Sequence, residues 1–264
     1  MQARVNPLEG YAVLITRPAG QGEGLAQLVK QRGGSPVIYP VFNIEPQTQG
    51  PEMRAAVSAL DKFDLVIFVS AHAVHAVMAV LTELGRFFPP AAEVAAIGPA
   101  TANCLEGYGV HPGYIPKDTI NSEGMLKSLS AFAAGGTKVV LFRGQNGREL
   151  LATGLADQGA EVLQIESYRR SLNDTAVSPR LKQWQLQGKP LLSLTSVAIM
   201  QGLLEKADTE ETKLILQSPL AVLSQRIAVS CRARGFKGVL QVADRPDDYA
   251  MVDALIKCTD DRTG

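Results

Sequence analysis

The chain has 264 residues, and its 26 Lys and Arg residues balance 26 Asp and Glu residues to a formal net charge of +0. At about 150 residues per domain, this length predicts one large or two modest domains. The balanced charge excludes the overall basic field typical of nucleic-acid-binding proteins, and a hydrophobic content of 46% excludes a disordered chain. No apolar run approaches the roughly 20 residues of a membrane helix, so no membrane partner is expected.

The N-terminal segment and the cysteines indicate the compartment. The first residues, MQARVNPLEGYAVLITR, lack a cationic region followed by an apolar stretch and a cleavage site, so a cytoplasmic location is expected. Cys104, Cys231 and Cys258 are far apart and form no C-x-x-C motif. We therefore expect reduced thiols, no disulfide framework and no metal site.

Short apolar segments alternate with amphipathic segments along the whole chain. The expected strands cover residues 11–16, 36–41, 65–70, 94–97, 139–143, 162–168, 191–195, 221–224 and 239–243. Helical patterns such as GLAQLVKQRG, AVHAVMAVLTELG and RELLATGLADQG lie between most of them. This order is typical of parallel sheets with right-handed crossovers, and it predicts the α/β class.

A single shift of 126 residues superimposes one half of the sequence on the other without a gap. It pairs Val13 with Val139, Arg17 with Arg143, Gly33 with Gly159, Ser70 with Ser196, and Gly109 with Gly235. Apolar pairs arise by chance in any α/β chain, but Gly, Arg and Ser pairs at equivalent strand ends are harder to obtain by accident. The shift therefore predicts an internal duplication that yields two similar lobes with a cleft between them.

The residues that follow the expected strands point to an anion site, because ligands of open parallel sheets bind beyond the carboxyl ends of the strands. The turns are TRP at 16–18, SAH at 70–72, GPAT at 98–101, RGQNGR at 143–148, TS at 195–196 and SQR at 224–226. Hydroxyl residues, Gly and Arg recur in these turns, and Asp and Glu are missing. Each Ser or Thr could equally be a helix N-cap, and each Arg a surface ion pair. Together they predict a site for a ligand with several carboxylates or phosphates.

Common catalytic motifs are absent. G-x-G-x-x-G fails at Leu25, and neither G-x-x-x-x-G-K-[ST] nor G-x-S-x-G occurs. His72 and His75 have the spacing of a metal pair, but no acidic or Cys partner is near them in the sequence. We therefore expect a reaction that a correctly positioned substrate nearly performs by itself.

Six segments carry a resemblance to a known family. They are VLITRPAGQGEGLAQLVKQRGGSPVIYPV, DLVIFVSAHAV, AAIGPATANCLEGYGV, the helix start at 122–126, VVLFRGQNGRELLATGLADQGAEVLQIESYRR and LAVLSQRIAVSCRARGF. In this order and spacing, the chain resembles the uroporphyrinogen-III synthases over essentially its whole length. The resemblance implies two α/β lobes, one of them discontinuous. Residues 1–38 and 172–264 would form the first lobe, 43–167 the second, and 39–42 and 168–171 the connector strands.

The resemblance also implies a reaction. The family's substrate is hydroxymethylbilane, a linear tetrapyrrole with eight carboxylates, which loses water and closes to uroporphyrinogen III with inversion of the last ring. No cofactor is implied. A monomer is implied, and a transient contact with the deaminase that forms the bilane is expected. The competing hypothesis is a non-catalytic two-lobed protein that binds an anionic small molecule.

The site residues follow from the same resemblance. Tyr168 is the implied general acid for the departing hydroxyl, and the alternative is a connector tyrosine that only packs its ring. The implied substrate-binding residues are Thr16, Arg17, Ser70, Gly98, Thr101, Ser122, Arg143, Gly144, Arg148, Ser196, Ser224 and Arg226. Two positions depart from the family pattern: His72 stands where many relatives have Asn, and Ile227 where a Thr is expected. We expect Arg226 to supply charge in place of that hydroxyl.

Overall fold

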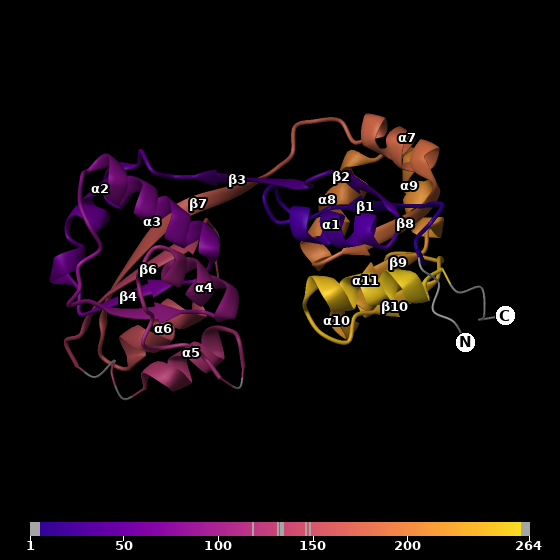
Figure 1. Cartoon of the computed structure of the whole chain (residues 1–264). Helices are drawn as coiled ribbons and strands as arrows, with labels where there is room; N and C mark the ends of the chain where they lie inside the picture. The colour runs from indigo at the N-terminus through magenta and orange to yellow at the C-terminus, as the bar shows by residue number, and fades with distance from the viewer. Residues whose placement is uncertain are drawn as a thin grey trace. The chain divides into compact units, whose positions relative to one another are not determined.

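The computed structural model describes residues 6–117, 119–130, 132, 135–145, 147 and 149–259. The chain divides into two compact units, which we call unit 1 (Met1–Asn43 and Ser171–Gly264) and unit 2 (Ile44–Arg170). Figure 1 shows that the indigo N-terminal segment shares unit 1 with the orange and yellow C-terminal part of the chain. Each unit is built on its own five-stranded sheet.

The sheet of unit 1 is parallel and has the order β10-β9-β8-β1-β2. Its strands are β1 (Tyr11–Ile15), β2 (Ser35–Ile38), β8 (Lys189–Leu194), β9 (Leu220–Val222) and β10 (Leu240–Val242). Four consecutive residues of β1 are buried, which is the pattern of a strand covered on both faces. The register places Val13 beside Pro36 on one side and Leu191 on the other.

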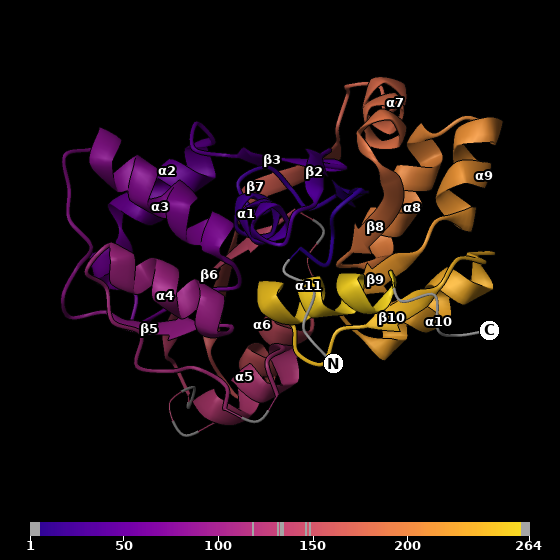
Figure 2. The ribbon, with the colours of Figure 1, turned by 45° about the vertical axis from the view of Figure 1, so that its right-hand side comes forward.

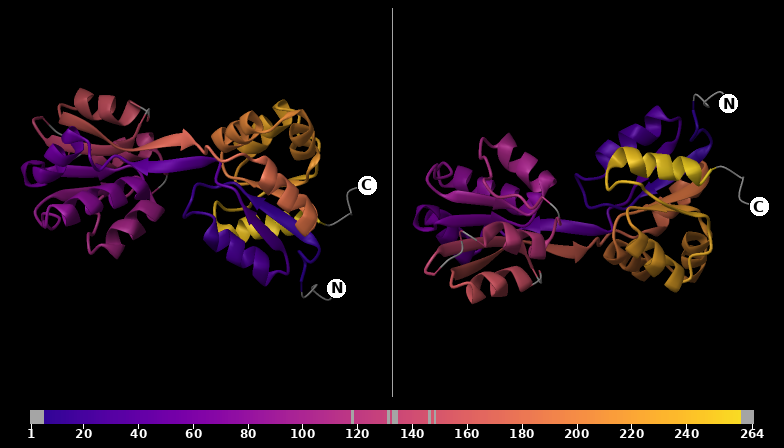
Figure 3. Two further views of the ribbon diagram at one scale, coloured as in Figure 1. Left: turned by 90° about the horizontal axis from the view of Figure 1, so that it is seen from above. Right: turned by 90° about the horizontal axis from the view of Figure 1, so that it is seen from below.

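Helices cover both faces of the unit 1 sheet. They are α1 (Glu23–Gln31), α7 (Ser178–Gln187), α8 (Val197–Lys206), α9 (Thr209–Gln217), α10 (Gln225–Ala233) and α11 (Asp248–Lys257). Val13 and Ile15 face the core under α1 and α11, whereas Ala12 and Leu14 face the core under α7 to α10, as the alternation of strand side chains requires. The view from above in Figure 3 shows α1 and α11 together on one side of the strands.

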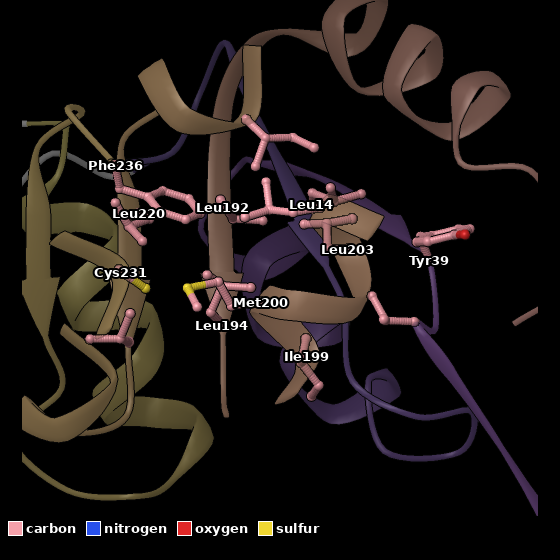
Figure 4. Packing of buried hydrophobic residues seen from close by; sticks show 14 of the residues in the cluster. Leu14, Tyr39, Leu192, Leu194, Ile199, Met200, Leu203, Leu220, Cys231 and Phe236 are labelled. Atoms are coloured by element: carbon pink, nitrogen blue, oxygen red, sulfur yellow. The ribbon is translucent and has the colours of Figure 1, made fainter. Parts of the chain in front are cut away.

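The core under α7 to α10 is the larger of the two in unit 1. Figure 4 shows Leu14, Leu192 and Leu194 of the sheet packed among side chains of α8 and α10. Trp184 of α7 is fully buried in the same core, and its indole N–H donates to the carbonyl oxygens of Ala12 at 2.8 Å and Leu191 at 3.1 Å. One side chain therefore bonds to two neighbouring strands, β1 and β8.

The sheet of unit 2 has the order β3-β7-β6-β4-β5. Its strands are β3 (Phe42–Pro46), β4 (Leu65–Phe68), β5 (Glu93–Ala96), β6 (Lys138–Gly144) and β7 (Glu161–Leu172). The pairs of β4 to β7 are parallel. β3 runs antiparallel to β7, since Asn173 N–H donates to Val41 and Gln47 N–H donates to Ser167, both at 2.9 Å. Figures 1 and 2 show the two strands side by side.

Unit 2 also has helices on both faces of its sheet. They are α2 (Pro51–Ser58), α3 (Ala71–Glu83), α4 (Pro99–Gly107), α5 (Ser122–Leu129) and α6 (Leu150–Asp157), with a 3₁₀ turn at Leu60–Lys62. The core that contains Phe68 and Phe142 lies under α2, α3 and α4. The core that contains Ile67 and Leu141 lies under α5 and α6. Each face of the buried strands therefore has its own apolar layer.

The predicted α/β class is confirmed, with two five-stranded sheets. Several strand boundaries differ from the sequence prediction, and two of these differences are the largest. The strand expected at 36–41 ends at Ile38, and the strand expected at 162–168 continues to Leu172. β7 extends because β3 pairs with its second half. Within the described ranges, no helix is long and apolar enough to cross a bilayer.

Candidate active site

The predicted site residues of unit 2 follow the carboxyl ends of its parallel strands. Ser70 follows β4 and Gly98 follows β5, while Gly144 ends β6 and Tyr168 lies on β7 beside Gly144. The carboxyl ends of parallel strands share one edge of the sheet, so the fold brings these residues to that edge. The first turns of α3 and α4 begin there, and their free N–H groups favour bound anions.

Three of the predicted serines are helix N-caps. The hydroxyl of Ser70 accepts from Ala73 N–H at 3.2 Å, that of Ser196 from Ile199 at 3.1 Å, and that of Ser224 from Ile227 at 3.5 Å. The cap interpretation is therefore confirmed for all three. Each hydroxyl keeps its own O–H donor, so a cap serine at a strand end can still donate to a carboxylate.

Ser122 and the two predicted threonines have different surroundings. Ser122 is the first residue of α5, and the cap is Asn121, whose side chain accepts from Gly124 N–H at 2.9 Å. Thr16 is fully buried and donates to the Ser193 carbonyl at 2.8 Å. Thr101 is buried in the first turn of α4. The Thr16 hydroxyl proton is thus used within the sheet.

The Arg143 guanidinium is buried, and its hydrogen bonds hold the turn after β6. It donates to Glu149 Oε1 at 2.7 Å, to the Gly147 carbonyl at 2.8 Å and to the side chain of Gln164. Hydrogen bonds from Gln164 and Arg143 hold the pKa of the Glu149 carboxyl below its usual value. Arg143 therefore organises its own turn in this structure. Arg148, predicted in the same turn, lies outside the described residues.

Arg17 also has a carboxylate partner within its own unit. Its Nη1 lies 2.5 Å from Asp248 Oδ1, and the side chain is mostly buried. Its Nε atom is buried and has no hydrogen-bond partner among the described residues. The prediction from the sequence omitted the turn after β10, DRPDD at 244–248, which brings Asp248 to this arginine. Arg226, in contrast, is exposed in the first turn of α10.

The Tyr168 ring is in close contact with Gly144 and His72. A Cβ on residue 144 would lie 2.7 Å from two ring carbons of Tyr168 and 2.9 Å from its hydroxyl oxygen. Only glycine leaves room for the phenol there, because real Cβ atoms do not approach that closely. The His72 ring, carried by α3, packs on the phenol with ring centroids 5.4 Å apart. Burial and the nearby His75 lower the pKa of His72.

Two further features lie away from these residues. A cavity of about 350 Å³ beside α5 is lined by Gly113, Tyr114, Ile115, Lys117, Thr119, Gly124, Lys127 and Ser128, and no predicted site residue lines it.

The second feature is the contact of His75 with two side chains. Its Nδ1 lies 2.9 Å from the Tyr108 hydroxyl oxygen, and its Nε2 lies 3.5 Å from the Cys104 sulfur. The described part of the chain contains no cluster of three or more metal-ligating residues.

Comparison with known proteins identifies the family. The model of the family described as uroporphyrinogen-III synthase HemD matches residues 23–253. The chain belongs to this family. It is 29% identical to the uroporphyrinogen-III synthase of Escherichia coli K12 and 30% identical to that of Salmonella typhimurium, in both cases over 92% of this chain and 99% of the relative.

Solved structures of uroporphyrinogen-III synthases have the same fold. A mutant of the Thermus thermophilus enzyme matches with a TM-score of 0.59 at 21% identity, over 94% of this chain and 98% of that one. The Helicobacter pylori protein matches with a TM-score of 0.58 at 16% identity over the same shares. The resemblance predicted from the turns is confirmed. As a uroporphyrinogen-III synthase, the chain is a hydro-lyase of tetrapyrrole biosynthesis.

Proposed function

We propose that the chain cyclises hydroxymethylbilane to uroporphyrinogen III, with loss of water and inversion of the last pyrrole ring. The observation that carries the proposal is the family match over residues 23–253, together with relatives named uroporphyrinogen-III synthase that align over 92% of the chain. The reaction needs little acid–base catalysis from the residues at the strand ends. Loss of the hydroxyl leaves an electrophilic azafulvene, so the substrate supplies the driving electrons and the protein has to control geometry.

The helix starts at the strand ends support the binding of a polycarboxylate. Four helices, α3, α4, α8 and α10, begin directly after parallel strands of the two sheets. Each offers free N–H groups and the positive end of its dipole to a carboxylate. In unit 1 the proposed contacts are Arg17, Ser196, Ser224 and Arg226. Thr16, the fifth residue predicted there, is fully buried and donates within the sheet, so it is not proposed as a contact. In unit 2 the proposed contacts are Ser70, Gly98, Thr101, Ser122, Arg143, Gly144 and Arg148.

Tyr168 is the proposed general acid. Its side chain is half-buried against the core under α3, and its hydroxyl end lies over Gly144 at the carboxyl end of β6. A phenol in this place can donate a proton to a departing hydroxyl group. We further propose cytoplasmic location, a monomeric state and transient contact with the deaminase that forms the bilane.

An internal duplication is part of the proposal. The shift of 126 residues carries α4 (Pro99–Gly107) onto α10 (Gln225–Ala233) from end to end. It also relates two hydrogen bonds, because Arg17 donates to the Gln21 carbonyl and Arg143 to the Gly147 carbonyl. In each sheet, the strands of one repeat's opening β-α-β unit pair with strands of the other repeat. β3 and β7 continue across the unit boundaries as the proposed connector.

The product assay tests the proposed reaction directly. Hydroxymethylbilane is generated in situ, the purified protein is added, and the oxidised uroporphyrin isomers are separated by chromatography. We expect the type III isomer to predominate with the protein and the type I isomer to predominate without it. Predominance of type I with a folded sample would refute the synthase activity and favour the non-catalytic anion-binding protein.

Replacing Arg226 by alanine should raise the KM for hydroxymethylbilane several-fold without loss of stability. Arg226 is exposed in the first turn of α10, where the helix dipole disfavours a cation, so its charge contributes to binding and not to folding. The matched control is Arg234→Ala at the other end of the same helix, for which we expect an unchanged KM. Equal KM values for the Arg226 variant and the wild type would contradict the proposed carboxylate contact.

A further inference from the structure

The β7 strand presents Tyr168 through a β-bulge. The pairing of β6 with β7 shifts between Arg143 and Gly144, so Gly144 lies beside Tyr168 while Ser167 is the extra residue. The Ser167 hydroxyl is buried and donates to the Arg143 carbonyl at 3.0 Å. Strict alternation would send Ile165 and Tyr168 to opposite faces, but both pack in the core under α3 and α4. The bulge therefore re-aims the phenol, as bulges near active sites do.

The Tyr168 ring also contacts a side chain of α3, which is His72. Gly144 leaves space for the ring, but a glycine has no side chain that could hold it. His72 provides a side chain, because it is the second residue of α3 and α3 packs on the same core as Tyr168. The two ring centroids are 5.4 Å apart, and the ring planes are inclined by 56°. That distance and tilt are within the favourable range for packed aromatic rings.

Burial makes His72 suited to this role. Its imidazole is partly desolvated, and both burial and His75 lower its pKa. Burial of the ring favours its uncharged form. An uncharged ring packs against a phenol without the cost of desolvating a cation.

We propose that His72 is a positioning residue for Tyr168, whose ring it holds over Gly144 at the carboxyl edge of the unit 2 sheet. The inference rests on the proposed role of Tyr168 as general acid. Without the imidazole, the phenol gains freedom to turn away from the leaving hydroxyl. Because a displacement of about 1 Å can reduce a rate by 10²-fold, the loss should fall on kcat, and KM should change little.

A double-mutant cycle tests the inference. We expect His72→Ala to lower kcat about tenfold, a typical coupling loss for contacting residues, with KM within twofold of the wild type. His72→Phe should recover most of kcat, because phenylalanine restores the ring. In a Tyr168→Phe background, His72→Ala should have little further effect. The matched control is Thr82→Ala, an exposed position near the end of α3, which should keep the wild-type kcat.

Nuclear magnetic resonance separates the inference from the acid role. With ¹³C-labelled tyrosine, the Tyr168 signal is the one missing from Tyr168→Phe, and it should shift in His72→Ala and return in His72→Phe. If Tyr168→Phe keeps the wild-type kcat while the signal shifts as expected, the acid role fails and the positioning contact stands. The inference is overturned if the signal does not move, or if His72→Ala lowers kcat equally in both backgrounds.

Discussion

Replacing Tyr168 by phenylalanine is expected to lower kcat by about 10²-fold or more, the typical contribution of a general acid. The variant keeps the ring that packs between Gly144 and His72, so unit 2 should keep its stability. It removes only the O–H group. KM should stay within a few-fold of the wild type, because the carboxylate contacts lie on other residues.

The measurement is the rate of uroporphyrinogen III formation under substrate saturation, with the isomer ratio determined in the same samples. Tyr11→Phe is the control, since Tyr11 begins β1 at the end of the unit 1 sheet opposite to the predicted site. It should leave kcat unchanged. A Tyr168→Phe variant with full activity would show that another group protonates the hydroxyl, and that Tyr168 only packs its ring.

Replacing Trp184 by alanine should produce the largest loss of stability. The side chain is fully buried in unit 1, and its indole N–H bonds to carbonyl oxygens of β1 and β8. Truncation leaves a large cavity and removes this donor, for which we expect a loss of about 3 to 5 kcal/mol. Trp184→Phe keeps much of the apolar volume and should lose clearly less.

The loss of stability is measured as a lower midpoint of urea-induced unfolding, with circular dichroism as the detection method. Trp184 is the only tryptophan in the chain, so its fluorescence in the wild type reports the unfolding of unit 1 separately. Leu186→Ala is the matched control on the same helix, because Leu186 is 87% exposed. Equal midpoints for Trp184→Ala and Leu186→Ala would contradict the central role of the tryptophan.

Local signals explain most of what the sequence predicted correctly. The apolar runs at 65–70 and 139–143 indicated buried strands, and serines directly after strands indicated helix starts. The α9 helix was readable in the same way but was missed. Its start forms a capping box between Asp208 and Glu211. The sequence DTEE at 208–211 has the residue spacing typical of this motif.

Contacts between distant residues could not be read from the turns. Arg17, a proposed substrate contact, is paired with Asp248 within unit 1. Asp248 is 231 positions away from Arg17, so no local pattern joins the two. The packing of Tyr168 between Gly144 and His72 likewise depends on a bulge and on a helix from another part of unit 2.

Local patterns in the sequence were therefore enough to predict the α/β class, the family and the turns after the strands that carry the candidate site. These depend on periodicity, capping and short motifs, which act over a few residues. The pairing of Arg17 with Asp248 and the place of the Tyr168 phenol became visible only in the folded chain. Those outcomes depend on pairing register and side-chain packing between segments far apart in the chain, whose energies no local pattern contains.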